Sequence, residues 1–243
     1  MHISGANTFL SMLSPALRSG LLRQAKAVEL PVHTVLCETT SPPRYAYFLL
    51  SGLASIVTTK PNGESAEVCF VGREGVVGGL HLLGPTPLST RCMMQMTGSG
   101  LRIPFQELQT AFDNSTEVRR LALEFVQQEA AVVAQIAGCN RLHNAEQRLV
   151  RWLLMAQDRV DRDTLAFTQE YLAEMISTQR TTVTITAGVL QERGLIRYSR
   201  GVIHIVDRLA LEATTCTCYR TIKELFEGLY QQQEQAGLTA ALA

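Results

Sequence analysis

Short apolar segments alternate with turn residues through the first half of the chain. From Pro31 to Ile103, stretches rich in Val, Ile, Leu and Phe are interrupted at short intervals by Gly, Pro, Ser and Asn. This spacing is typical of the short strands of a β-sandwich or barrel. Asn62-Gly63, a favoured hairpin turn, separates the apolar segments Leu53 to Thr59 and Ala66 to Val71. The pattern predicts an N-terminal β-domain in which these two segments form a hairpin.

A helical pattern follows this β-domain. Between Phe105 and Ala137 the chain has no Gly or Pro and its apolar residues recur at helical spacing, which predicts one long helix that Gly138 ends. Alanines widen the apolar surface of this helix: Ala122, Ala130, Ala131, Ala134 and Ala137. Either the rest of the same domain covers that surface or the helix pairs with its copy in a symmetric dimer. The width of the surface favours the dimer.

The next segments predict a helix, a tight turn, a second helix and a hairpin. After a helix from Asn144 to Asp158, Thr168 is a suitable N-cap for a short helix, and Ser177-Thr178 supplies a turn. Apolar residues mark the inner faces of the two helices around that turn: Leu172, Met175 and Ile176 on the first, Val183, Ala187 and Leu190 on the second. Arg197 to Val206 contains two β-like runs around a turn near Ser199 to Gly201. This order of elements is that of a winged helix.

The start of the second helix carries side chains that suit DNA recognition. An α-helix fits the major groove, and the N-terminal part of a recognition helix reaches the base edges. Arg180 can donate two hydrogen bonds to guanine, and Gln179 can pair with adenine. The predicted DNA-binding residues are Thr178, Gln179, Arg180, Thr181, Thr182 and Thr184 on this helix, with Arg197 and Arg200 on the hairpin as phosphate contacts. Alternatively, Arg197 and Arg200 only increase solubility.

Composition excludes several other classes of protein. Hydrophobic residues make up 46% of the 243 residues and charged residues 18%, which excludes a disordered or fibrous chain. Lys plus Arg and Asp plus Glu number 22 each, so attraction to nucleic acid must come from a local patch. Such a patch lies between residues 180 and 208, where the sequence contains more basic than acidic residues. The five basic residues are Arg180, Arg193, Arg197, Arg200 and Arg208, and the two acidic residues are Glu192 and Asp207.

The cysteines and the start of the chain point to an ordinary cytoplasmic protein. The six cysteines include no C-x-x-C pair, so we predict free thiols, no metal site and no cofactor. Cys216 and Cys218 form the one C-x-C, and a role in sensing oxidants stays open.

The chain lacks the pattern of a secretory signal and has no long apolar stretch, which predicts no membrane segment. A cupin-like metalloenzyme is disfavoured because His33 and His81 stand alone, and we predict no enzymatic activity.

Three segments resemble the Crp/Fnr family of bacterial transcription regulators. Leu172 to Ser177, followed by Arg180 to Thr184 and Gly194 to Ile196, is similar to the winged helix of that family. Phe48 to Val57 resembles a strand and turn of its effector barrel, and Cys139 to Trp152 resembles the segment that joins its dimer helix to its DNA-binding domain.

The resemblance implies an α+β fold with a cyclic-nucleotide-binding-like β-barrel, a long dimerisation helix and a winged helix-turn-helix. The corresponding domains are residues 1–110, 111–138 and 139–212, with a C-terminal helical extension and tail at 213–243. It also implies a homodimer that binds a palindromic promoter site on double-stranded DNA, with RNA polymerase as a candidate partner. A small-molecule effector is expected, and the sequence leaves its identity open.

The effector pocket departs from the cyclic-nucleotide pattern of the family. Cyclic-nucleotide binders carry a Gly-Glu pair and an Arg-Ser pair, where this chain has Gly78-Gly79 and Ser89-Thr90. Arg91 is one residue out of register and would face the other side of the sheet, so nothing neutralises a buried phosphate and cyclic AMP is disfavoured. Haem held by His33, His81 or a cysteine stays an alternative.

The DNA-binding segment also departs from the family pattern at three positions. Ser177 stands where the family usually has a turn glycine. Thr181 and Ile185 stand at two positions that are commonly polar base contacts in cyclic-AMP-responsive members.

Overall fold

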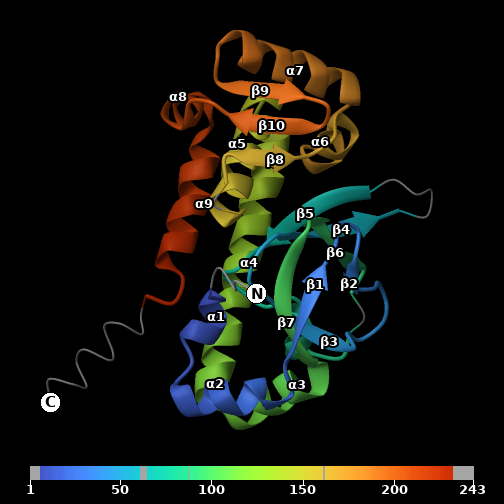
Figure 1. The fold of residues 1–243 in the computed structure, drawn as a ribbon, viewed down its shortest axis with the longest axis vertical. Helices are drawn as coiled ribbons and strands as arrows, with labels where there is room; N and C mark the ends of the chain where they lie inside the picture. Colours follow the sequence, from blue (N-terminus) through green and yellow to red (C-terminus); the bar gives the residue numbers. More distant parts are fainter. Residues whose placement is uncertain (1–5, 61–64, 87, 161, 232–243) are drawn as a thin grey trace, which may run out of the picture.

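The computed structural model describes residues 6–60, 65–86, 88–160 and 162–231. Figure 1 shows a β-barrel and a smaller C-terminal domain stacked along one long helix. The core of the C-terminal domain continues into the barrel, because barrel residues such as Leu53, Cys69 and Phe70 belong to the same apolar cluster. Within the described part of the chain, no helix is both long and apolar enough to cross a membrane.

The N-terminal domain is the predicted β-domain. Its two antiparallel sheets have the strand orders β1-β7-β3 and β2-β6-β4-β5. The strands are β1 (Lys26–Leu30), β2 (Val35–Cys37), β3 (Tyr45–Leu49), β4 (Leu53–Thr59), β5 (Ser65–Val71), β6 (Thr90–Met96) and β7 (Gly98–Pro104). The predicted pairing of β4 with β5 is confirmed, from Ala54 opposite Val71 to Thr59 opposite Ser65. The Asn62-Gly63 turn itself lies outside the described residues.

Short helices precede and interrupt the strands of the barrel. They are α1 (Thr8–Ser11), α2 (Pro15–Leu21), η1 (Leu22–Gln24) and η2 (Gly79–Leu83). Asn7 caps α1 by accepting a hydrogen bond from the Leu10 N–H, and its amide donates to the carbonyls of Leu49 and Gly75. The first helix is thereby fixed to the barrel by a buried polar side chain.

The prediction of one helix from Phe105 to Ala137 was wrong at two places. The segment forms α3 (Phe105–Asn114) and α4 (Thr116–Leu142), separated by Ser115 in an extended conformation. The Ser115 hydroxyl caps α4 by accepting a hydrogen bond from Val118, and the break lets α3 turn onto β3 and β7. Gly138 does not end α4, because the buried Cys139 keeps the next turn packed and the helix continues to Leu142.

The C-terminal domain has the predicted order of elements. It contains α5 (Ala145–Val160), β8 (Thr164–Ala166), α6 (Gln169–Met175), α7 (Arg180–Glu192), β9 (Ile196–Ser199), β10 (Val202–Ile205), α8 (Arg208–Thr214) and α9 (Thr217–Gly228). The predicted hairpin is β9-β10, and β8 adds a third strand that the sequence pattern did not indicate. The winged helix is confirmed.

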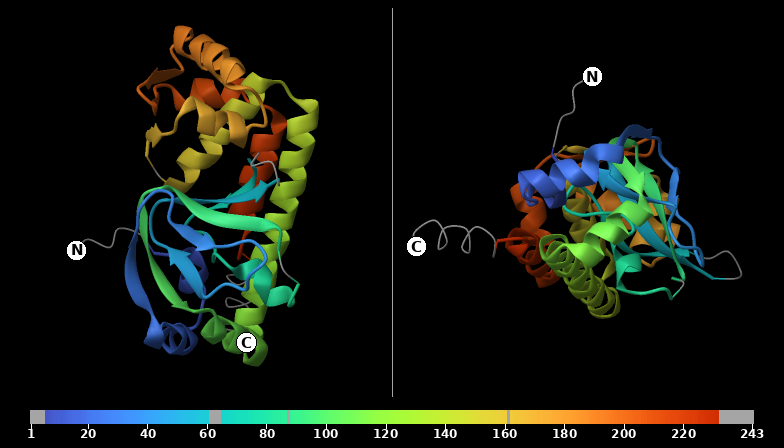
Figure 2. Two further views of the ribbon diagram at one scale, coloured as in Figure 1. Left: turned by 90° about the vertical axis from the view of Figure 1, so that its right-hand side faces the viewer. Right: turned by 90° about the horizontal axis from the view of Figure 1, so that it is seen from below.

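Helix α9 returns from the C-terminal domain toward the barrel. It packs against α4 and α5, and both views of Figure 2 show it beside α4. Beyond it, the side chain of Tyr230 is buried among barrel residues, with its ring edge-on to Phe9. The extension predicted from residue 213 is therefore helical up to Gly228, whereas the tail after Gln231 lies outside the described residues.

Candidate nucleic-acid interface and a cavity beside the long helix

Helices α6 and α7 are joined by a tight turn with a strained residue. The Thr168 hydroxyl caps α6 by accepting a hydrogen bond from the Tyr171 N–H at 3.2 Å. After α6, Ser177 adopts a φ of 51°, a left-handed conformation that glycine adopts more easily. The Thr178 N–H still donates to the Ala173 carbonyl at 2.9 Å. The turn is therefore as tight as a glycine would allow, at a cost in backbone strain.

The start of α7 faces outward. Its inner face is buried through Val183, Ala187 and Leu190. The predicted contact residues lie on the other side, where Thr178 and Thr182 are half-buried and the rest are exposed: Gln179, Arg180, Thr181 and Thr184. Gln179 is the N-cap residue, so the helix begins at Arg180, two residues after the first residue of the predicted contact set. The end of the helix that carries unpaired N–H groups is thus open to solvent.

Arg180 is held at the surface by one ion pair. Its guanidinium lies 2.7 Å from the Glu170 carboxylate at the start of α6, and its side chain is 64% exposed. An exposed pair of this kind contributes little to stability, so a guanine or a phosphate can replace the carboxylate at low cost. Thr184 donates to Gln169 at 2.7 Å, which places the second turn of α7 against α6.

The hairpin places further arginines beside α7. Arg200 and Gly201 form its two-residue turn with φ values of 50° and 77°, and Arg197 and Arg200 are both exposed. A hollow of about 380 Å³ lies between the hairpin and the start of α6 and α7, and Arg180 and Arg200 both line it. Of the eight predicted contact residues, Arg180 from the helix and Arg200 from the hairpin line this hollow, and the other six lie outside it.

A second hollow, of about 390 Å³, lies between the barrel and α4. Most of its lining is apolar, including Ile56, Val71, Val76, Val77, Leu80, Leu88, Val126 and Val133. Three of the predicted pocket residues, Gly78, Gly79 and Thr90, line this cavity, whereas Ser89 and Arg91 are not among its lining residues. Arg91 instead forms an ion pair with Glu38 at 3.5 Å.

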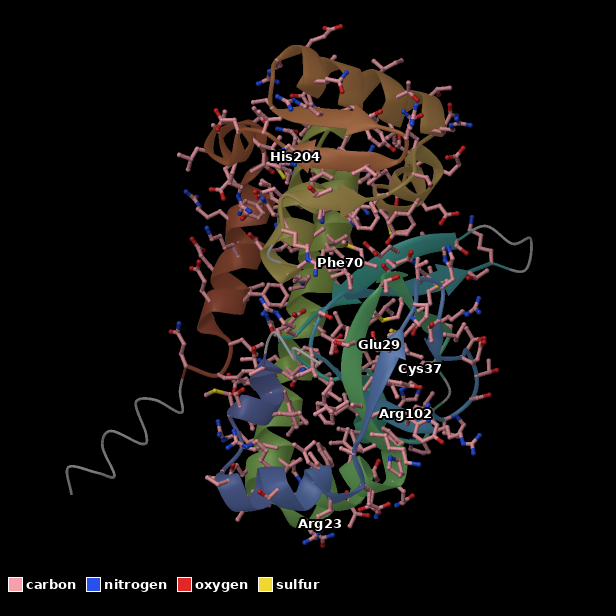
Figure 3. The ribbon with its side chains drawn as sticks, viewed as in Figure 1. Arg23, Glu29, Cys37, Phe70, Arg102 and His204 are labelled. Atoms are coloured by element: carbon pink, nitrogen blue, oxygen red, sulfur yellow. The ribbon has the colours of Figure 1, made fainter. Side chains whose placement is uncertain are left out.

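Burial shifts the pKa values of the titratable side chains of the cavity toward their uncharged forms. Burial raises the pKa of Glu129 to about 8, and the nearby Glu74 carboxylate adds to this rise. Burial lowers the pKa of His81, whose ring nitrogens have no hydrogen-bond partner among the described residues. Burial also raises the pKa of Cys37 to about 12, and Figure 3 shows this residue within the barrel. None of the described lining residues is Lys or Arg, so a buried phosphate would lack a counter-charge.

Comparisons with known proteins agree for both domains. The cyclic nucleotide-binding domain family matches residues 27–115, and the Crp-like helix-turn-helix domain family matches residues 147–214. This chain belongs to the Crp/Fnr family.

Solved structures of Crp/Fnr proteins have the same fold. A transcriptional regulator of this family from Eubacterium rectale superposes with a TM-score of 0.67 at 16% identity, over 86% of this chain and 95% of that one. FixK2 from Bradyrhizobium japonicum gives a TM-score of 0.67 at 15% identity, over 79% of this chain and 98% of that one. The c-di-GMP responsive regulator CLP from Xanthomonas campestris gives 0.65 at 16% identity, over 80% of this chain and 100% of that one. Among proteins of curated function, none matches this sequence.

This Crp/Fnr protein also contains a cluster of thiols that the sequence analysis missed. Cys139, Cys216 and Cys218 lie together, with the ring of His143 beside them. The hydrogen bond with Cys139 lowers the pKa of Cys216 to about 5 and raises that of Cys139. Two short motifs in the sequence belong to this cluster: C-x-x-x-H at the end of α4 and C-x-C at the start of α9. Each motif supplies only two potential metal ligands, too few to indicate a metal site by itself.

Proposed function

We propose that the protein regulates transcription as a homodimer that binds a palindromic site on duplex DNA. The observation that carries this proposal is the surface shared by the N-terminus of α7 and the hairpin, with Arg180 and Arg200 on one hollow. Arg180 and Gln179 would read bases in the major groove. Arg197 and Arg200 would hold the adjacent phosphates, which fixes the orientation of the helix on the duplex.

A stripe along α4 supports pairing with a second copy. Side chains that are exposed in the single chain recur at alternating steps of four and three residues: Leu123, Gln127, Ala130, Ala134 and Ala137. Such spacing keeps one face of a helix along a partner helix, and alanines let two backbones approach closely. Helix α9 also packs against α4, with Gln127 beside it, and all five side chains of the stripe stay exposed in the single chain. A symmetric pair would present two copies of α7, as a palindromic site requires.

The cavity favours a small, uncharged and largely apolar effector. Its walls are apolar, and Glu129 and His81 are neutral groups that can each form a hydrogen bond with a ligand. A cyclic nucleotide would bring a phosphate into a site with no cation on the described lining residues. Because Val126, Glu129 and Val133 belong to α4, a bound molecule would touch the helix that we propose forms the dimer.

The function is tested by DNA binding of the Arg180→Ala variant. We expect the variant to lose about 1 to 3 kcal/mol of affinity for the cognate site, or roughly 5- to 150-fold, in gel-shift titrations at several salt concentrations. Arg220→Ala is a matched control, because Arg220 is also an exposed helical arginine paired with one glutamate. If wild type and Arg180→Ala bind every duplex equally, Arg180 does not read bases.

The dimer is tested by charge placed on the α4 stripe. Ala134→Glu would set two carboxylates against each other across the proposed interface, so we expect sedimentation to show monomers where the wild type is dimeric. Ala213→Glu adds the same charge at an exposed alanine of α8, outside the stripe, and leaves the dimer intact. A dimer that survives Ala134→Glu places the interface elsewhere.

A further inference from the structure

Four potential metal ligands converge where α4 ends and α9 begins. Cys139 lies on the last turns of α4 and His143 is its C-cap, whereas Cys216 is the N-cap of α9 and Cys218 follows on its first turn. Their sulfur and nitrogen atoms all lie within 4.8 Å of one another. The two pairs come from segments more than 70 residues apart, so only the tertiary fold brings them together.

Two of the six distances among these atoms match the edges of a zinc tetrahedron, and the other four are at most 4.8 Å. The Sγ atoms of Cys139 and Cys216 are 3.6 Å apart, and the Sγ of Cys218 lies 3.6 Å from Nδ1 of His143. Tetrahedral zinc with ordinary bond lengths separates two sulfurs by about 3.8 Å and a sulfur from a nitrogen by about 3.6 Å. Side-chain movements of about 1 Å or less would bring the remaining distances to those of a tetrahedron.

The donor set and its burial indicate a structural site. Three thiolates and one imidazole are a common set for tetrahedral structural zinc. The three cysteines are buried and the histidine is half-buried, and four protein ligands leave no open position for water or substrate.

A buried arginine gives an independent indication of negative charge at this cluster. Arg151 is completely buried, and among the described residues no carboxylate lies within ion-pair distance of it. Its Nε donates to the Sγ of Cys139 at 3.2 Å, and its other nitrogens donate to Met155 and Asn140. A buried cation needs a compensating anion. Zinc with three thiolates and a neutral imidazole has a net charge of −1. The Glu67 carboxyl group also acts on Arg151 electrostatically, but without direct contact, so the zinc site would be the anion that Arg151 contacts directly.

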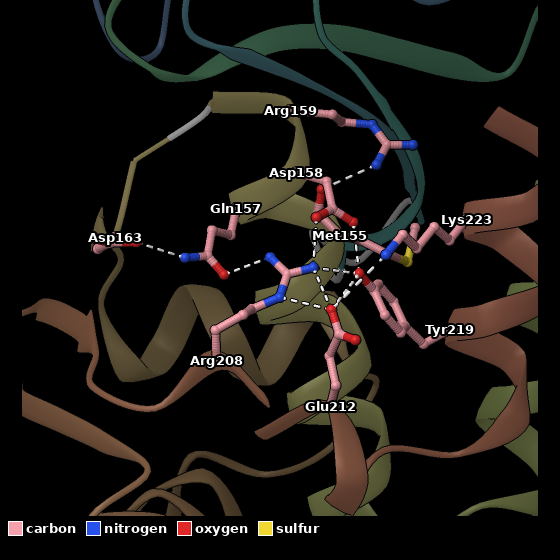
Figure 4. A network of polar contacts seen from close by, with 9 residues as sticks. All are labelled: Met155, Gln157, Asp158, Arg159, Asp163, Arg208, Glu212, Tyr219 and Lys223. Carbon is pink, nitrogen blue, oxygen red and sulfur yellow. Dashed lines mark hydrogen bonds and ion pairs between the residues drawn. The ribbon is translucent and has the colours of Figure 1, made fainter. Parts of the chain in front are cut away.

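The geometry points to a structural zinc site formed by Cys139, His143, Cys216 and Cys218. Bound zinc would join the end of the long helix to the start of α9. Figure 4 shows that a network of polar contacts already holds α8 and α9 against α5, with Arg208 2.7 Å from Asp158 and Tyr219 donating to Asp158 at 2.9 Å. The metal would add the corresponding link to α4, and so fix the C-terminal domain at the end of that helix.

Metal content and a cobalt spectrum test this site on the full chain. Protein purified under reducing conditions should hold about one zinc ion per chain, and Co²⁺ added to the metal-free protein should give the visible absorption of tetrahedral cobalt with a thiolate charge-transfer band. Cys218→Ser should lose both signals. Cys37→Ala, which removes a buried thiol far from the cluster in the chain, should keep both.

Arg151 supplies a second variant that leaves all four ligands in place. If it balances the charge of the site, Arg151→Met should weaken zinc binding by about 10- to 100-fold in competition with a chelator while keeping the tetrahedral cobalt spectrum. Wild-type protein that binds no metal and gives no cobalt spectrum would overturn the proposal. So would a Cys139–Cys216 disulfide in metal-free protein taken from cells without reductant.

Discussion

Two contacts of different chemistry join the C-terminal domain to the rest of the chain. The first, here called the barrel junction, surrounds the Glu67 carboxyl group of β5 with Ser55, Trp152 and Tyr171. The second, the helix junction, consists of Arg151 with the three cysteines and the histidine at the end of α4. Figure 3 shows Phe70, which packs edge-on against Trp152 at 5.8 Å, between the barrel and the C-terminal domain.

The two junctions differ in how their buried charge is satisfied. Glu67 accepts a hydrogen bond from the Trp152 indole at 2.7 Å and another from Tyr171 at 3.3 Å, and burial raises its pKa to about 7. All of its partners belong to this chain. In the helix junction a permanent cation, Arg151, faces thiols that are only weak acceptors. The barrel junction therefore responds to protons, whereas in the helix junction the proposed zinc site would supply an anion in direct contact with Arg151.

The largest effect on the barrel junction is expected from Trp152→Ala. Trp152 is 1% exposed, and its ring contacts Phe70, Phe167 and Tyr171. Removing it leaves a cavity between the two domains, so we expect the free energy of unfolding to fall by about 3 to 5 kcal/mol. Urea unfolding followed by circular dichroism measures this change.

Trp152→Phe separates packing from hydrogen bonding at the same position. The variant keeps most of the ring and loses the N–H that donates to Glu67, so a loss of about 1 to 3 kcal/mol is expected. If the alanine variant unfolds no more easily than the phenylalanine variant, the aromatic contacts do not hold the two domains together.

The sequence predicted the winged helix but neither junction. The helix-turn-helix depends on apolar spacing within a few turns, as with Val183, Ala187 and Leu190, and such local patterns are readable without a fold. Trp152 lies 85 residues from Glu67, and Cys139 lies 77 from Cys216. A glutamate in a strand or a solitary C-x-C gives no sign of its distant partner.

The break at Ser115 and the end of α4 had local signals of unequal strength. Ser115 is followed by Glu117 in the first turn, a normal start for a helix, but the absence of Gly and Pro from the segment is the more conspicuous feature of the sequence. Gly138 was expected to end the helix because glycine is a poor helix former. Packing of the neighbouring Cys139 outweighs that cost of about 1 kcal/mol.

The next prediction is a pH dependence that distinguishes the two junctions. Because the pKa of Glu67 is raised in the folded protein, the folded state binds more protons than the unfolded state between about pH 4.5 and 7. The free energy of unfolding should therefore fall as the pH rises through this range, by up to about 1.4 kcal/mol per pH unit, and level off above it.

Glu67→Gln should remove this part of the pH dependence. Glu129, whose pKa is also raised, contributes a slope of the same sign that extends to about pH 8, so Glu129→Gln serves as the comparison variant. A Glu67→Gln profile with the wild-type slope between pH 5 and 7 would mean that the Glu67 carboxyl is not the group that titrates.

The smallest expected effect is that of Tyr171→Phe. Tyr171 belongs to α6, directly before the helix with Arg180, and its hydroxyl is within 2.9 Å of Ser55 and 3.3 Å of Glu67. Its ring, stacked on Phe167, stays in place, so the loss should be about 1 kcal/mol. Because the hydrogen bond from the Tyr171 hydroxyl is one of those that lower the pKa of Glu67, its removal should also move the midpoint of the pH profile upward.

Tyr198→Phe is the control for this variant. It removes a hydroxyl that donates to the Phe167 carbonyl at 2.9 Å within the C-terminal domain, and it should leave the midpoint unchanged. Equal midpoints for the two variants would show that α6 does not contact the barrel through Glu67 in solution.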